Sequence, residues 1–441
     1  MKVAAHTTVL RACHLKGEEL NARIREKCIF CRFLKNASLL LALLIVACTN
    51  NPRSPLTHEA YIWQRQWTPA LDASIDAASG HFTAWRVLAL ESKASGELVD
   101  TAPHFDVIVR SDLPVIAVMR LNGSRPPPSV EMLAGRLRDL ASKWRVAGVK
   151  LIGVEVDHDC ATAQLDRYAD LLTHLRTELP PGLTLSITVL PTWIGAPVLS
   201  RLLAAVDTSV LQVHAVSAPQ PGQVDAGLFD AQRARGWIAA YSTLAPHPFR
   251  VALPAYGVRV GFDDEGRAVA VASEMARDIS AAETHELRVA PKDVAGLLRD
   301  LQTERPHGLI GITWFRLPSE DDRRAWSLAT LHAVIDGAAS LETQLALRLD
   351  ATESGVRDVV VLNRGAIDAP LPALVIVQAR ACSAVDALAG FRVESQPDGR
   401  HFVQQNDAAN SDAILRAGRE RRIGWLRCDV VGGATLGETR R

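Results

Sequence analysis

Short apolar runs alternate with amphipathic stretches along most of this chain. Eight runs have the length and character of buried strands, at 60–63, 82–90, 113–121, 149–157, 183–190, 208–216, 249–256 and 307–315. Stretches with apolar residues at helical spacing separate most of them, at 129–147, 164–178, 227–244, 291–303 and 323–335. Eight such units over about 280 residues predict an α/β fold in which the strands close into a TIM (β/α)8 barrel. The count of eight includes one choice, because 105–110 could also be a strand.

Two later segments depart from this alternation. Runs at 258–262 and 268–271 flank the turn sequence DDEGR, and they predict a hairpin inserted after the seventh strand. Beyond Gly337, β-prone runs with turn signals follow one another without long amphipathic helices, at 343–350, 356–363, 371–379 and 422–431. We therefore expect a barrel domain at 58–338 and a small C-terminal β-sandwich domain at 341–441.

An apolar run near the N-terminus predicts export rather than a place in the fold. Residues 37–47 are apolar or small and follow the basic Arg32 and Lys35. The run is too short to span a bilayer and matches the apolar region of a secretory signal. It ends in IVAC at Cys48, which resembles the bacterial lipobox, where the signal is cut before a cysteine that then carries lipid.

We accordingly expect a leader and lipoprotein signal peptide at 1–47 and a tether at 48–57. Lipid on Cys48 would hold the protein at a membrane of the bacterial cell envelope, either the outer membrane or the periplasmic face. An ordinary signal peptide or an N-terminal anchor helix is the alternative. Cys382 and Cys428 could form a disulfide in such an oxidising compartment, or remain an incidental pair of thiols.

The overall composition of the chain does not indicate a class of binding partner, so we expect any partner to be recognised by a local site. The 441 residues include 49 Lys and Arg and 49 Asp and Glu, so no basic excess indicates nucleic-acid binding. Hydrophobic residues make up 48% and charged residues 22%, as in ordinary folded proteins. No glycine-rich phosphate loop occurs, and we expect no cofactor.

Three acids stand at alternate positions of one apolar run. The stretch 149–160 reads VKLIGVEVDHDC, so Glu155, Asp157 and Asp159 share one face of the predicted strand. The outer face of a barrel strand packs against helices, so these acids should face inward, towards the mouth where barrel enzymes keep their chemistry. Acids this close in a poorly solvated site raise one another's pKa and can hold one carboxyl protonated. The alternatives are that Arg120 or Arg316 neutralises them for stability alone, or that they bind a hard cation such as calcium.

Several motifs in this chain resemble those of family-18 chitinase-type glycoside hydrolases. The stretch 152–159 reads IGVEVDHD, along the family's Asp-Gly-x-Asp-x-Asp-x-Glu. In family order there follow QVHA at 212–215, LPAYG at 253–257 and GLIGITW at 308–314. The chain is also similar to uncharacterised bacterial envelope proteins that carry a domain of unknown function.

The resemblance implies roles for individual residues. Asp159 would be the general acid, Asp157 would orient it or a substrate group, and Glu155 would complete the acidic set. Trp314 and Tyr256 would shape a sugar subsite. Asp159 stands where the family has glutamate.

His214 stands where the family has a tyrosine, and it could donate a hydrogen bond into the barrel mouth. Arg316 could pair with the acids or bind substrate. Trp63 and Trp193 lie near predicted strand ends, where aromatic rings can stack on sugars.

These features predict a glycoside hydrolase-like envelope lipoprotein that acts on a polysaccharide by carboxylate acid/base chemistry. Its partners would be a glycan and, through the lipid, a membrane. The alternative function is a non-catalytic saccharide-binding or scaffold lipoprotein that retains the barrel cleft.

Overall fold

A computed structural model describes residues 54–93, 95–215, 228–272, 281–352, 354–405 and 413–437. The predicted leader, signal peptide and Cys48 lie outside these ranges. None of the helices within them is long and apolar enough to cross a bilayer.

The barrel domain is a closed ring of eight parallel strands. Its strands are β1 (Thr57–Ile62), β2 (Ala84–Ser92), β4 (Val115–Leu121), β5 (Leu151–His158), β6 (Thr184–Val189), β7 (Thr208–Gln212), β8 (Phe249–Pro254) and β12 (Leu309–Phe315). Strand β1 pairs with both β2 and β12, which closes the ring. The short β3 (Leu98–Asp100) adds an antiparallel partner to β2. All eight predicted runs are strands, so the predicted TIM barrel is confirmed.

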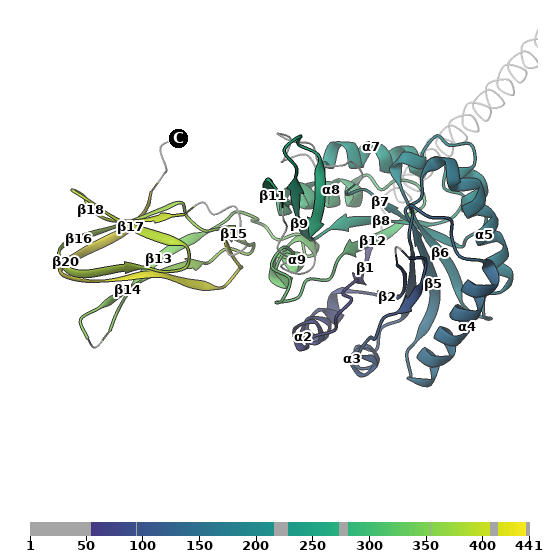
Figure 1. The fold of residues 1–441 in the computed structure, drawn as a ribbon, viewed down its shortest axis with the longest axis horizontal. Coiled ribbons are helices and arrows are strands. Elements are labelled where there is room, and N and C mark those ends of the chain that lie inside the picture. Colours follow the sequence, from purple (N-terminus) through teal and green to yellow (C-terminus); the bar gives the residue numbers. More distant parts are fainter. Residues whose placement is uncertain are drawn as a thin grey trace, which may run out of the picture. The chain divides into compact units, whose positions relative to one another are not determined.

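Helices cover the outside of this ring (Figure 1). They are α2 (Pro69–Ala78), α3 (Phe105–Arg110), α4 (Val130–Val146), α5 (Leu165–Thr177), α6 (Leu199–Ala204), α7 (Ala231–Ser242), α8 (Pro291–Thr303) and α9 (Leu328–Ile335). The run at 105–110, which could have been a strand, is therefore the helix α3.

Helix α4 illustrates how the sequence fixes these elements. Ser129 caps its first turn by accepting a hydrogen bond from the Met132 amide at 3.3 Å. Leu133, Leu137 and Trp144 recur at helical spacing and are buried in the main core. That core lies between the helices and the outward faces of the strands, where aliphatic side chains such as Val154 and Val156 of β5 belong to it.

The predicted hairpin after β8 is confirmed and gains a third strand. Strand β9 (Gly257–Phe262) pairs antiparallel with β10 (Ala268–Ala272) on one side and with β11 (Glu283–Arg288) on the other. A Cβ atom at Gly257 would lie 2.8 Å from the Leu287 carbonyl oxygen. Glycine is therefore required where this insertion leaves the barrel.

The C-terminal domain is built on a six-stranded antiparallel sheet. Its order is β13 (Leu345–Ala351), β14 (Arg357–Asn363), β20 (Glu420–Gly437), β16 (Leu374–Ala387), β18 (Gly399–Gln404) and β17 (Phe391–Gln396). A two-stranded pair, β15 (Ala369–Pro370) with β19 (Ile414–Leu415), accompanies it. Val361, Val375, Phe402 and Ile423 belong to a core cluster separate from that of the barrel. The predicted C-terminal β domain is thus confirmed.

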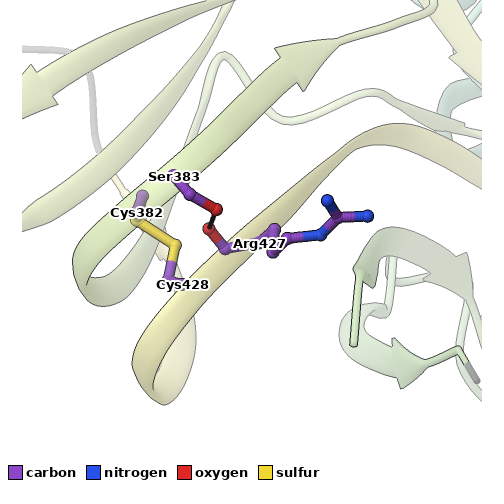
Figure 2. Close-up of a disulfide and its surroundings, with 4 residues drawn as sticks. All are labelled: Cys382, Ser383, Arg427 and Cys428. Carbon is purple, nitrogen blue, oxygen red and sulfur yellow. Dashed lines mark hydrogen bonds between the residues drawn. A yellow bond between two sulfur atoms is a disulfide. The ribbon is translucent and has the colours of Figure 1, made fainter. Parts of the chain in front are cut away.

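A disulfide joins the two longest strands of this sheet. Cys382 and Cys428 lie opposite each other in the β16–β20 ladder and are bonded (Figure 2). Beside them, Ser383 Oγ donates to the Arg427 carbonyl at 3.3 Å. The sequence left open whether these cysteines are bonded. Cys160 is a free, buried thiol.

We predict that Cys382→Ala and Cys428→Ala each lower the free energy of unfolding by about 2–4 kcal/mol, because the bond restricts the unfolded chain over a separation of 46 residues. The variant that lacks both cysteines should be as stable as either single variant. Denaturant unfolding, with and without a reductant, measures the effect. Two single effects that add up in the double variant would contradict the bond.

Candidate functional site

The deepest of the three predicted acids belongs to an ion network inside the barrel. Glu155 is fully buried, accepts a hydrogen bond from Tyr61 Oη at 2.6 Å and forms an ion pair with Arg86. Arg86 Nε also donates to Glu59 at 2.7 Å, and Arg250 pairs with the other oxygen of Glu59 at 2.8 Å. Two carboxylates and two guanidiniums thus balance in charge, as buried ions must. Burial raises the pKa of Glu155, while Arg86 and the Tyr61 hydrogen bond oppose this rise.

The middle acid is held by two partners. Asp157 is 3% exposed; its Oδ2 accepts from Arg120 Nη1 at 2.6 Å and its Oδ1 accepts from Thr188 Oγ1 at 2.7 Å. Both carboxyl oxygens are therefore occupied, and the side chain is fixed in orientation.

The last acid is the least satisfied. Asp159 has a side chain about one-third exposed (32%), and its Oδ2 lies 3.5 Å from Arg120 Nη2. Its Oδ1 has no hydrogen-bond partner within the described part of the chain. Burial and the negative charge of Asp157 raise the pKa of Asp159 to about 7, against the opposing effect of Arg120. The carboxyl is therefore about half protonated at neutral pH, which suits an acid that must donate a proton.

A pocket of about 210 Å³ opens where these side chains end. It brings together five of the predicted site residues, which are Trp63, Asp157, Asp159, His214 and Tyr256. The other residues that line it are Tyr61, Arg120, Thr188, Gln212, Ala215, Ala252 and Phe315.

Aromatic rings form one wall of this pocket. The Phe315 ring centroid lies 5.2 Å from that of Trp63, 5.6 Å from that of Tyr61 and 5.2 Å from that of Tyr256. The Arg120 guanidinium lies 5.5 Å from the Trp63 ring centroid, within cation–π range. Phe315 is thus the centre of the aromatic wall.

The structure does not place Trp314 in the pocket. Side chains alternate along β12, and Phe315 rather than Trp314 has the inward parity. Trp314 is fully buried on the outer face, where its Nε1 donates to His58 Nδ1 at 3.0 Å. The place in the pocket that was predicted for Trp314 is therefore taken by the ring of its neighbour Phe315.

Three more predicted residues also lie outside the set that lines the pocket. Glu155 belongs to the network described above. Trp193 is fully buried, and its Nε1 donates to the Cys160 carbonyl at 3.1 Å. Arg316 is buried and pairs with Asp322, and its guanidinium lies 5.7 Å from the Tyr256 ring centroid.

Sequence reasoning treated Arg120 only as a possible neutralising cation, and it did not find Phe315. Both could have been found by period-two parity, because Arg120, the last but one residue of β4, stands two residues after the inward Val118, and Phe315 ends β12 two residues after Thr313. Within the described ranges, no group of three His, Cys, Asp or Glu side chains is arranged to hold a metal ion.

The raised pKa of Asp159 predicts a pH-dependent loss of stability. An unfolded aspartate has a pKa of about 3.9, so between this value and about 7 the folded chain binds more protons than the unfolded chain. Stability should therefore fall as pH rises through this range. Asp159→Asn, which cannot ionise, should match the wild type near pH 4 and become more stable than it by about pH 8.

Denaturant unfolding at a series of pH values measures this difference. Asp139→Asn, on the exposed face of α4, is the control and should give a difference that does not change with pH. Parallel stability curves for the wild type and Asp159→Asn would contradict the raised pKa.

Two family models match this chain, one within the barrel and one within the C-terminal sheet. Residues 111–320 match the model of a domain of unknown function (DUF3142), and residues 346–429 match that of another domain of unknown function (DUF8456). No curated protein matches the chain.

Several solved structures are similar to this chain. A chitinase from Chromobacterium violaceum is 17% identical, with a TM-score of 0.46 over 65% of this chain and 99% of that one. A chitinase from Bacteroides thetaiotaomicron is 11% identical, with a TM-score of 0.45 over 66% of this chain and 100% of that one. The spore cortex-lytic enzyme SleL from Bacillus cereus is 14% identical, with a TM-score of 0.41 over 60% of this chain and 72% of that one. The chain thus matches the models of two domains of unknown function, one within the barrel and one within the C-terminal sheet.

Proposed function

We propose that this protein is a glycosidase of the bacterial cell envelope that cleaves a polysaccharide with Asp159 as its general acid. The observation that carries the proposal is the state of Asp159. It lies in the pocket, has one oxygen without a partner among the residues that the structure describes, and has a pKa raised to about 7. A general acid works best when its pKa is near the working pH, and cleavage of a glycosidic bond needs a proton on the leaving oxygen.

Asp157 and Arg120 support this acid rather than share its role. Because both oxygens of Asp157 are bonded, this carboxylate is poorly placed to attack a sugar or to activate a water molecule. Its charge instead adds to the effect of burial, which is the larger cause of the raised pKa of Asp159. No other carboxylate is among the described residues of the pocket, so attack at the sugar carbon would come from water or from an acyl group of the substrate itself.

The aromatic wall suits the apolar face of a sugar ring. Trp63 and Phe315 line the pocket and can stack on such a face. A volume of about 210 Å³ is below the roughly 300–1,000 Å³ of pockets that enclose larger ligands. The pocket therefore accepts about one sugar unit, and the rest of a glycan would extend across the barrel mouth.

We predict that Asp159→Asn lowers kcat/KM for the polysaccharide by about 100-fold or more, because proton donation is lost. The wild-type rate should fall as pH rises above about 7, where Asp159 loses its proton. A screen of envelope and biofilm polysaccharides for released reducing ends identifies the substrate and gives the rates. Asp139→Asn serves again as the matched control and should keep full activity.

Cleavage that survives Asp159→Asn would overturn the assignment of the acid. Binding without cleavage by the wild type would favour the other function considered, a saccharide-binding protein that retains the pocket.

The proposed location in the envelope is supported by two observations. The sequence at Cys48 resembles a lipobox. The disulfide between Cys382 and Cys428 is of a kind that persists in oxidising compartments and is rare in the cytosol.

We predict that the wild type fractionates with membranes and that Cys48→Ala releases it into the soluble fraction, because the lipid would be attached to that thiol. Labelling with a radioactive fatty acid and fractionation of cells measure both effects. Cys28→Ala, in the same N-terminal segment, is the control and should leave labelling unchanged. A Cys48→Ala protein that still takes up the label would contradict lipidation at this residue.

A further inference from the structure

His214 is buried at the end of a barrel strand and lines the pocket. It follows β7, is 2% exposed, and forms an isolated antiparallel bridge with Phe229. The next residue, Ala215, has a φ of 52°, in the left-handed region that residues other than glycine rarely adopt. The Ala215 amide donates to the Leu228 carbonyl at 2.8 Å, which holds the backbone there. Backbone of this kind is found where a side chain must be aimed for a function.

The two ring nitrogens of His214 have different surroundings. Nδ1 lies 3.3 Å from Tyr256 Oη. Nε2 is buried and has no hydrogen-bond partner among the residues that the structure describes. A buried polar group without a partner is costly, so it marks a place where a ligand can supply the missing bond.

Tyr256 is held in place and retains its proton. Its ring contacts the Phe315 ring at 5.2 Å, and the Arg316 guanidinium, itself paired with Asp322, lies 5.7 Å from it. Burial raises the pKa of Tyr256, so the hydroxyl remains a donor. Burial also lowers the pKa of His214 to about 3, so the imidazole is neutral at any ordinary working pH. A neutral imidazole has one donor nitrogen and one acceptor nitrogen, and its partner decides which is which.

We propose that Tyr256 donates to Nδ1 of His214 and thereby fixes the proton on Nε2, which presents an uncharged N–H donor to an uncharged oxygen of the bound glycan. Tyr256 is then a positioning residue that acts through His214. This inference rests on the proposed function for the identity of the ligand. A neutral donor offers no ion pairing to a carboxylate or a phosphate, so it suits the hydroxyl or carbonyl oxygen of a neutral sugar unit at this position.

The state of the ring can be tested in the full chain without any knowledge of the natural substrate. Nitrogen-15 NMR distinguishes the two neutral tautomers and the cation of each of the 13 histidines, and the signals lost in His214→Gln identify those of His214. We expect one tautomer, with the proton on Nε2, throughout about pH 5 to 8. Tyr256→Phe should convert it to a mixture of tautomers.

Tyr241→Phe is the matched control. Tyr241 is a buried tyrosine whose hydroxyl bonds to Ser209 Oγ at 2.7 Å, and it is not among the residues that line the pocket. Its loss should leave the His214 tautomer unchanged. A proton on Nδ1 in the wild type, titration of His214 within this pH range, or a Tyr256→Phe variant that keeps the single tautomer would overturn the inference.

The ligand is tested by adding N-acetylglucosamine, glucose or glucuronate to the labelled protein. We expect the neutral sugars to move the Nε2–H signal of His214 and glucuronate to leave it in place. A neutral sugar that shifts other pocket signals but not this one would overturn the proposed hydrogen bond. A locked tautomer together with no binding of any sugar would refute the glycan as ligand and the proposed function, and would retain only the role of Tyr256 in fixing the ring.

Discussion

The barrel depends on the balance of charge along its axis. Glu155 and Glu59 can be buried between the strands only because Arg86 and Arg250 accompany them, since an isolated buried charge costs far more than the fold can tolerate. Room for these long side chains comes from glycine. A Cβ atom at Gly311 would lie 2.1 Å from Nη1 of Arg250, so the strand must carry hydrogen at that position. Most apolar packing is thereby left to the outer faces of the strands, and the interior holds this ion network beside a small cluster of Tyr61, Trp63, Leu88 and Val118.

The number of hydrogen-bonding partners of each acid decreases from the barrel interior towards the mouth. Glu155 has three hydrogen-bonding partners, Asp157 has one for each oxygen, and Asp159 has a single long contact. The three acids stand at alternate positions towards and just beyond the end of β5, and of the three Asp159 is the one with an oxygen that lacks a partner among the described residues. An acidic strand therefore contains residues of different kinds, the deeper ones stabilising the interior and the outermost one available for chemistry.

The local spacing of apolar residues was sufficient to predict the strands and helices, but it could not predict which side chains pair with one another between strands. Short apolar runs separated by stretches of helical spacing predicted all eight strands, because buried barrel strands need apolar residues along most of their length. Parity also predicted correctly that the acids face inward. The ion pairs join strands far apart in the chain, with Arg86 and Glu155 separated by 69 residues, and no local pattern specifies such a pairing. Trp314 was assigned to the pocket by its resemblance to a motif, and the alternation of β12 gives that place to Phe315 instead.

Arg120 links the stability of the interior to the chemistry of the mouth. One of its terminal nitrogens lies 2.6 Å from Asp157 and the other 3.5 Å from Asp159, so the cation stabilises the first carboxylate more than the second. If it were as close to Asp159, the ionised form would be favoured and the pKa would fall towards that of an ordinary aspartate. The shorter side chain of aspartate, where the resembling family has glutamate, is compatible with this arrangement, because it keeps the carboxyl in the partly dry region beside Asp157. Burial and the charge of Asp157 therefore raise the pKa of Asp159, and the unequal division of one arginine between the two carboxyls leaves that rise only partly opposed.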